Sequence, residues 1–163
     1  MDRLWSPWRL EYVARGESKT GCIFCEATRH EDSNPLIVFE GKTSYIILNL
    51  YPYNNGHLMV VPYRHLSTFA SLSIDEITEI GILIQRAESA LMEAYTPNGF
   101  KVGVNLGKPA GAGVLDHLHV HIVPRWNGDT NFTTVVGDMR VLPENLGASA
   151  ARLRPIFARL TQV

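Results

Sequence analysis

The chain has 163 residues, of which 45% are hydrophobic and 19% charged, and its formal net charge is −1 at pH 7. A chain of about 150 residues buries about 70% of its unfolded surface, so this length suits one domain with its own core. The near-neutral charge argues against nucleic acid or an anionic membrane surface as the main partner. The sequence shows neither the ~18 consecutive apolar residues of a membrane span nor an N-terminal apolar signal segment.

Residues 1–34 are predicted to form an irregular N-terminal extension, and residues 35–163 the main domain, without a linker that would make them two structural units. The extension contains Cys22-Ile23-Phe24-Cys25, a CxxC spacing that lets two thiolates share one metal ion. Taken alone, this is half of a zinc site or equally a redox pair. The redox pair usually opens a helix in a βαβ unit, and the sequence shows no such unit. Cysteines spaced as ligands favour a cytoplasmic protein.

The middle of the chain alternates short strand patterns with one long helix. The helix is predicted to start at the capping box of Ser73 and Glu76, to run to about Tyr95, and to end at Thr96-Pro97-Asn98-Gly99. Leu146–Leu160 is predicted as a final helix. β-Branched and aromatic content predicts five strands, at Leu36–Phe39, Tyr45–Leu48, Leu58–Val61, Phe100–Asn105 and His117–Val123. This succession predicts an α+β fold with a five-stranded antiparallel sheet.

The connection between the last two strands, Asn105 to Gly113, is rich in glycine. Glycine allows backbone N–H groups to approach a phosphate closely and to converge on it. A flexible hairpin loop is the better interpretation for such a stretch alone. The phosphate interpretation gains weight from the histidines that follow.

The last strand contains His117, His119 and His121, separated by single apolar residues. Side chains alternate faces along a strand, so the three imidazoles should share one side and originate roughly 6.6 Å apart. Half of the six histidines of the chain fall within these five residues. We therefore interpret the stretch as a functional site rather than as a strand with a polar face.

His117-Leu118-His119-Val120-His121-Ile122-Val123 resembles the signature of the histidine-triad (HIT) superfamily of nucleotide hydrolases and nucleotidyl transferases. The segment Asn49–His57, followed by Leu58-Met59-Val60-Val61-Pro62, resembles the nucleoside-binding segment of that family. Arg3–Arg9 and Pro124–Phe132 are more like the bacterial branch that includes diadenosine tetraphosphate phosphorylases. The resemblance implies the HIT-like fold, with two chains paired in a homodimer.

The resemblance also implies roles for individual residues. His119 holds the place of the nucleophile, which would form a covalent nucleotidyl-histidine, and the other triad histidines, His117 and His121, complete the catalytic group. His121 would hydrogen-bond a phosphate oxygen. The remaining implied positions are Asn105 beside the phosphate, Asn49 on the ribose, His57 in the nucleoside segment, and the backbone N–H groups of Gly111, Ala112 and Gly113 on the phosphoryl oxygens. Asn49 could equally be a turn residue after its strand.

One position departs from the family pattern. Many members carry Gln, Ser or Thr a few residues before the first histidine, where the side chain can contact the phosphate or the leaving group. This chain has Gly113 and Val114 there. Assistance to the leaving group must then come from backbone, water or another residue.

In the zinc-bearing branches of the superfamily, a CxxC pair is completed by a histidine after the nucleoside segment and by the first triad histidine. Those positions are His65 and His117, next to Cys22 and Cys25. Two thiolates and two imidazoles make a closed tetrahedral site that suits structural Zn²⁺. The motif requires no divalent cation for the chemistry, and Mg²⁺ is expected at most as a companion of the polyphosphate.

The leading hypothesis is an enzyme that cleaves diadenosine tetraphosphate by phosphorolysis or hydrolysis. Hydrolysis of purine nucleoside phosphoramidates is the alternative within the same chemistry. Two other classes stay open: an enzyme that binds a metal through His117, His119 and His121, and a nucleotide-sensing module without turnover. Metal content and an activity assay separate these classes.

Overall fold

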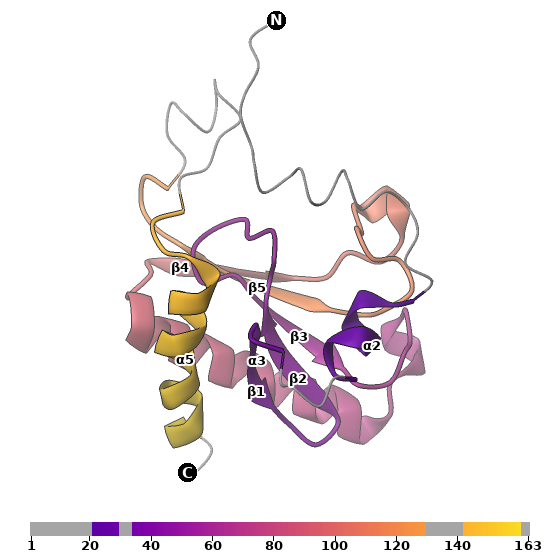
Figure 1. Ribbon diagram of the computed structural model, residues 1–163. Coiled ribbons are helices and arrows are strands. Elements are labelled where there is room, and N and C mark those ends of the chain that lie inside the picture. Colours follow the sequence, from indigo (N-terminus) through magenta and orange to yellow (C-terminus); the bar gives the residue numbers. More distant parts are fainter. Residues whose placement is uncertain (1–20, 30–33, 130–141, 161–163) are drawn as a thin grey trace, which may run out of the picture.

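The computed structural model describes residues 21–29, 34–129 and 142–160. Their strands form one antiparallel sheet in the order β1-β2-β3-β5-β4 (Figure 1). The bounds are β1 Ile37–Glu40, β2 Ser44–Leu48, β3 Leu58–Pro62, β4 Gly99–Gly103 and β5 Val120–Arg125. The predicted five-stranded antiparallel α+β fold is confirmed. The segment Arg3–Arg9 and residues 130–132 lie outside the described residues.

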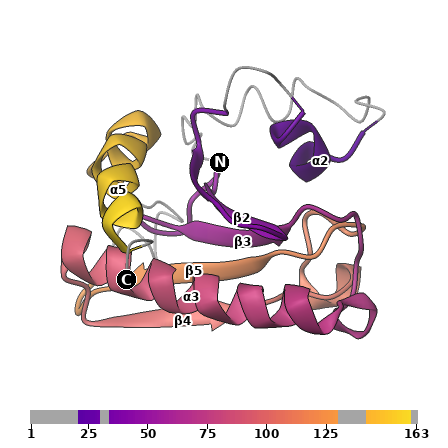
Figure 2. The same cartoon turned by 90° about the horizontal axis from the view of Figure 1, so that it is seen from below.

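Two helices pack on one face of the sheet. They are α3, Ile74–Tyr95, and α5, Leu146–Leu160, and both match the predicted ranges. Alternate residues of the central strands, such as Ile46, Val60 and Ile122, face these helices in the main hydrophobic core. Figure 2 shows α3 running along the strands. Among the described residues, neither helix is long and apolar enough to cross a bilayer.

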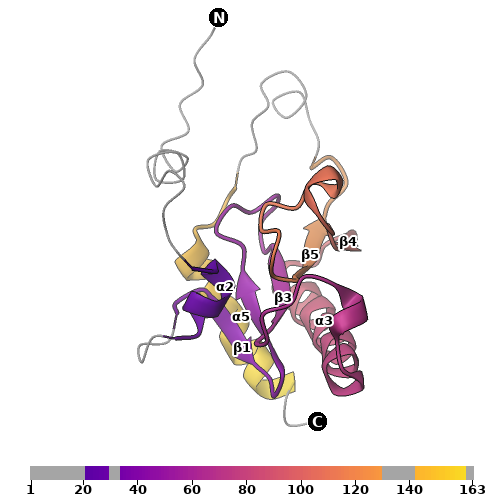
Figure 3. The same ribbon diagram turned by 90° about the vertical axis from the view of Figure 1, so that its right-hand side faces the viewer.

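The opposite face of the sheet is covered in part by α2, Ile23–Ala27 (Figure 3). The expectation that residues 1–34 are wholly irregular was therefore wrong at this helix. The reason is that Phe24 is buried in a second apolar cluster with residues of β1, β2 and β3, which pins the segment to the sheet. Five residues are too few to give a periodic signal in the sequence. The division of the chain at residue 34 stays a prediction.

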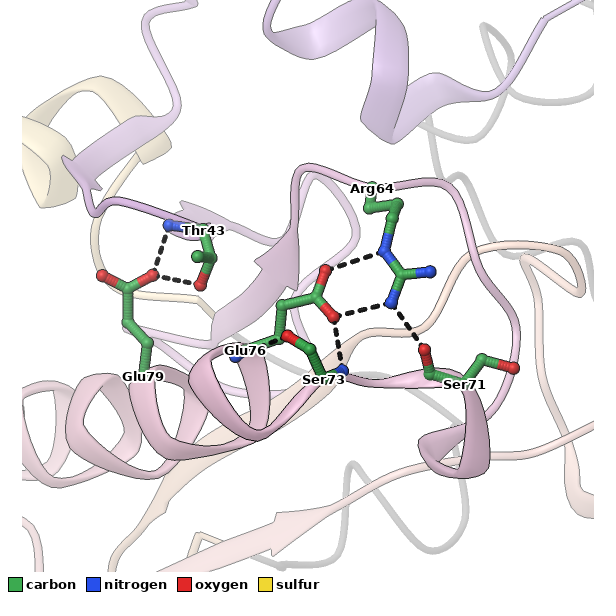
Figure 4. Close-up of polar contacts among 6 residues, drawn as sticks. All are labelled: Thr43, Arg64, Ser71, Ser73, Glu76 and Glu79. Carbon is green, nitrogen blue, oxygen red and sulfur yellow. Dashed lines mark hydrogen bonds and ion pairs between the residues drawn. The ribbon is translucent and has the colours of Figure 1, made fainter.

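The start of α3 is fastened to two neighbouring loops (Figure 4). The predicted capping box is present, since Ser73 accepts from the Glu76 N–H and Glu76 accepts from the Ser73 N–H. Arg64 donates from Nε and Nη2 to the Glu76 carboxylate at 2.9 and 2.7 Å, which holds the β3–α3 connection, 63–73, against the helix. One turn later, Glu79 accepts from the backbone N–H and the hydroxyl of Thr43, both at 2.5 Å, and so closes the β1–β2 hairpin.

The strand of the histidines begins later than predicted. β5 starts at Val120, and His117 to His119 lie outside regular strand structure. The reason is that this segment bonds to the β3–α3 connection, because the Leu118 N–H donates to the Leu66 carbonyl at 2.6 Å. The predicted alternation still holds across the boundary, since Val120 and Ile122 enter the main core while His121 lies opposite Met59 of the second cluster. β4 is likewise shorter than predicted and ends at Gly103.

The loop before β3 is held at both ends. Gly56 has φ +72°, and a Cβ there would lie 3.0 Å from Leu91 and 2.9 Å from Tyr95 of α3. A side chain would therefore meet both the helix and a strained backbone. Asn54 donates to the Pro124 carbonyl at 3.1 Å and to Asp129 at 2.8 Å. These contacts place His57, which follows Gly56, in the interior of the protein.

Candidate active site and metal-binding group

His119 has one ring nitrogen committed to the backbone. Its Nδ1 lies 2.8 Å from the carbonyl oxygen of His117. A carbonyl oxygen only accepts, so Nδ1 carries the proton and donates. The Nε2 of the neutral ring then keeps its lone pair, which is the form a nucleophilic imidazole requires.

In His121 the proton lies on the other ring nitrogen than in His119, and the contact with His57 determines this. The Tyr53 backbone N–H donates to His57 Nδ1 at 3.0 Å, and the amide nitrogen of Asn49 lies 3.3 Å from the same atom. The proton of neutral His57 is therefore on Nε2, which donates to His121 Nδ1 at 2.9 Å. The proton of His121 must then be on Nε2. At Nε2, His121 is therefore a donor and His119 an acceptor. The two ring centroids are 4.8 Å apart.

Burial keeps these imidazoles neutral at pH 7. Desolvation, followed by the nearby His121 and His119, lowers the pKa of His57 to about 3. Desolvation, followed by His119, lowers the pKa of His121 to about 4. Burial also lowers the pKa of His119, against a smaller opposite effect of its bond to His117. The neutral tautomers assigned above are therefore the working forms.

These lowered pKa values predict that stability falls as the pH is reduced from 7 to 5. Histidine in the unfolded chain has a pKa near 6.5, so the unfolded state binds protons in this range while folded His57 and His121 do not. Each group should remove about 2 kcal/mol of unfolding free energy over this range. Urea unfolding at pH 7, 6 and 5 measures the slope for the wild type and for His57→Gln. The variant retains Cys22, Cys25, His65 and His117, so its slope should be shallower by the contribution of His57; equal slopes would contradict the expectation.

Both ring nitrogens of His117 have partners different from those of the other two triad histidines. Its Nε2 donates to the Pro62 carbonyl at 2.8 Å, which leaves the Nδ1 lone pair directed at the thiols. Cys22 Sγ is 3.1 Å and Cys25 Sγ 3.5 Å from that Nδ1, and Cys25 Sγ is 3.4 Å from His65 Nδ1. The four candidate ligand atoms all lie within 4.8 Å of one another.

This donor set fits a zinc ion. Zinc bonds of about 2.3 Å to sulfur and 2.0–2.1 Å to nitrogen in a tetrahedron leave neighbouring ligand atoms roughly 3.3–3.8 Å apart, close to the distances here. The Pro62 carbonyl fixes the tautomer of His117 in the manner usual for metal-bound histidines. Within the described parts of the chain, these four residues are the group whose ligand atoms converge in this way. Cys22 is the N-cap residue of the short α2, which belongs to no βαβ unit among the described elements.

The glycine-rich loop is exposed and partly closed on itself. Gly107 and Gly111 both adopt positive φ, at +80° and +86°. The Gly111 N–H donates to the Lys108 carbonyl at 3.0 Å and the Ala112 N–H to the Gly107 carbonyl at 3.3 Å. Two of the three N–H groups expected to face a phosphate are thus engaged inside the loop. Asn105 donates to the Gly111 carbonyl at 3.4 Å, so its side chain supports the loop.

Asn49 and His57 of the nucleoside-binding segment both form hydrogen bonds within the loop before β3. Asn49 accepts from the Tyr51 N–H at 3.0 Å while its amide nitrogen lies beside His57, which matches the turn interpretation of this residue. His57 is fully buried, and both its ring nitrogens have protein partners. His57 is therefore linked to the triad by its hydrogen bond to His121.

Sequence reasoning missed three aromatic residues of the site. The Phe24 ring lies 4.9 Å from that of His119, and the Tyr53 ring 5.7 Å from that of His121. Tyr45 is fully buried, and its hydroxyl donates to the Phe24 carbonyl at 2.8 Å. The signals for Phe24 and Tyr53 were their places inside the CxxC and the nucleoside segment, whereas Tyr45 carried no signal beyond its strand.

The fold and the site together define an α+β protein in which a neutral histidine, with its Nε2 unprotonated, lies beside a Cys₂His₂ group. The family model described as "HIT domain" matches residues 31–128. The chain therefore belongs to the HIT family.

Two sequence relatives and one solved structure match most of the chain. The sequence is 41% identical over 167 residues to "AP-4-A phosphorylase" of Mycobacterium tuberculosis, covering 98% of this chain and 86% of that protein. It is 29% identical to "Bis(5'-adenosyl)-triphosphatase" of Dictyostelium discoideum, over 74% of this chain and 85% of the relative. The fold is similar to a zinc-bound histidine triad family protein from Mycobacterium smegmatis, with a TM-score of 0.70, 28% identity and coverage of 86% and 96%.

Proposed function

We propose that the chain is a nucleotidyl-histidine enzyme that cleaves dinucleoside polyphosphates, such as diadenosine tetraphosphate, at the α-phosphate. The observation that carries this proposal is the pair of opposite tautomers, with a lone pair on His119 Nε2 and a proton on His121 Nε2. One ring can attack phosphorus while its neighbour donates to a phosphate oxygen. The printed names of the relatives from Mycobacterium tuberculosis and Dictyostelium discoideum support the same substrate class.

The reaction then proceeds in two displacements. His119 Nε2 forms a bond to the α-phosphorus, and the bond from that phosphorus to the bridging oxygen breaks, which releases ATP from diadenosine tetraphosphate. His121 Nε2–H stabilises the charge on the phosphoryl oxygens. In the second displacement an acceptor attacks the same phosphorus and breaks its bond to His119. Water as acceptor gives AMP, and inorganic phosphate gives ADP.

We infer that phosphate is the preferred acceptor. A Cβ built at Gly113 would meet no atom within 4 Å, so this position leaves space for an anion. Its N–H is also the remaining candidate donor, since Gly111 and Ala112 donate within the loop. The similarity to the mycobacterial phosphorylase over 98% of this chain supports the same choice.

Diadenosine tetraphosphate with inorganic phosphate is expected to yield ADP and ATP. Chromatography of the products with and without phosphate measures this, and ¹⁸O-labelled phosphate should place its label in ADP. A purine nucleoside phosphoramidate tested in parallel separates the alternative substrate class. If phosphate changes neither the rate nor the AMP product, the phosphorylase assignment fails and the hydrolase assignment stands.

The three-histidine metalloenzyme has less support. Each triad histidine directs a Nδ1 to a different partner, which is a thiol pair for His117, a carbonyl for His119 and an imidazole for His121. Zinc in our proposal is structural and is held by Cys22, Cys25, His65 and His117. A sensing module would bind nucleotide without forming an adduct, so the same product assay separates it from an enzyme.

We further propose a homodimer located in the cytoplasm. β4 lies at one edge of the sheet that the described residues form, and Val102 on it is exposed, as are Ile74 and Ile77 on α3. Exposed apolar groups at a sheet edge and on a helix suit a second copy of the chain. Any Mg²⁺ would arrive with the polyphosphate.

A further inference from the structure

Phe24 points into the protein although it lies in a short helix at the edge of the domain. Its side chain is 4% exposed, whereas that of its neighbour Ile23 is 56% exposed. The Phe24 ring lies 4.9 Å from the His119 ring at 41° and 5.5 Å from the His117 ring at 68°. These centroid distances are within the range of direct aromatic contact. Phe24 therefore touches both a candidate metal ligand and the candidate nucleophile.

Several independent contacts fix the place of Phe24. The residues on either side of the Ile23–Phe24 pair are Cys22 and Cys25, the two thiols of the metal-binding group. The Tyr45 hydroxyl, fully buried, donates to the Phe24 carbonyl at 2.8 Å. The ring itself is packed in the apolar cluster with Ile37, Ile47, Met59 and Val61. Its position is thus determined by the same segment that carries half of the metal ligands.

The His119 imidazole needs a further contact to fix the orientation of its ring. Its one described hydrogen bond, from Nδ1 to the His117 carbonyl, holds the ring at a single atom and still permits rocking about that contact. His119 also precedes the first residue of β5, so regular strand pairing does not restrain it. The His121 ring meets it edge-on at 4.8 Å and 79°. Phe24 supplies the further contact that limits the direction of Nε2, and in-line attack depends steeply on that direction.

We propose that Phe24 is a positioning residue for the His119 imidazole and links the Cys22–Cys25 segment to the chemistry at His119. This inference rests on the proposed function, in which His119 is the nucleophile. It assigns to the metal-binding segment a second task besides stability. The contact with His119 sets the geometry of the attacking nitrogen without touching the substrate.

The test compares Phe24→Leu with Ile47→Ala in the zinc-loaded full chain. Leucine keeps an apolar side chain but removes the aromatic face, whereas Ile47→Ala opens a cavity in the same cluster without removing a ring from His119. Phe24→Leu is expected to lower kcat about 10- to 100-fold, with KM within about threefold of the wild type. Ile47→Ala should lower the melting temperature and leave kcat within about twofold.

Two further readouts separate positioning from a general structural effect. Elemental analysis should give the same zinc content in both variants as in the wild type. In ¹⁵N-histidine spectra, the Nδ1–H signal of His119 should be protected in the wild type and in Ile47→Ala, and should exchange faster in Phe24→Leu. Wild-type kcat in Phe24→Leu, or an equal loss in Ile47→Ala, would overturn the inference. Absence of a nucleotide adduct on His119 in the wild type would instead overturn the proposed function.

Discussion

Replacing His119 by alanine is expected to reduce turnover of diadenosine tetraphosphate by at least ~10³-fold, as loss of a covalent nucleophile should. The reason lies in the hydrogen bond from Nδ1 to the His117 carbonyl, which leaves Nε2 as the unprotonated nitrogen. Nucleotide affinity should stay within about an order of magnitude, because the bonds that hold His121 and His57 do not involve His119. Quenching the wild type during turnover and digesting it should give a nucleotide adduct on the peptide of His119.

The control for this variant is a test that the fold and the neighbouring metal-binding group are intact. His119→Ala keeps Cys22, Cys25, His65 and His117, so its zinc content should match that of the wild type. Its melting temperature should fall by a few degrees, because the buried ring that packs against Phe24 and His121 is lost. If the variant is folded and metal-loaded but inactive, its loss of turnover is due to the missing nucleophile. An active His119→Ala enzyme, or an adduct on another residue, would refute the assignment of the nucleophile.

The second large effect is expected from the metal-binding group. The wild type should contain close to one zinc ion per chain, and Cys22→Ser should lose it, because serine replaces the thiolate whose Sγ lies 3.1 Å from His117 Nδ1. A ligand present at 1,000 times its dissociation constant stabilises the folded state by about 4 kcal/mol. For a chain of this size that corresponds to roughly 8–16 °C in melting temperature. Loss of stability should be the main effect, because the site is structural. The kcat should fall no further than in Phe24→Leu, since this segment contacts His119 through Phe24.

Glu26→Gln is the matched control for this second prediction. Glu26 lies on the same short helix, outside the four-residue group, so the variant should retain its zinc. Elemental analysis and thermal unfolding, with and without a chelator, measure both effects. A metal that survives the loss of both cysteines but disappears with His119 would favour the three-histidine metalloenzyme instead.

The candidate site was predictable where residues close in sequence act together. The His117–His121 spacing and the CxxC each mark a group of side chains through local geometry, because strand alternation and a single turn bring their members together. Gly111, Ala112 and Asn105 were assigned from the resemblance, whereas their hydrogen bonds were not predictable. The N–H groups of Gly111 and Ala112 donate within the loop because its two positive-φ glycines turn the backbone back on itself.

The sequence by itself determined the class of fold, the bounds of both long helices and the histidine cluster. Periodicity and capping are local properties, and Ser73 and Glu76 meet across one helical turn whatever the rest of the chain does. Tertiary structure alone decided which nitrogen of each histidine carries the proton. That choice depends on partners distant in sequence, such as Pro62 for His117 and His57 for His121. It also decided the place of Phe24 against His119, since burial against a sheet whose first strand begins 13 residues later has no signature in a five-residue helix.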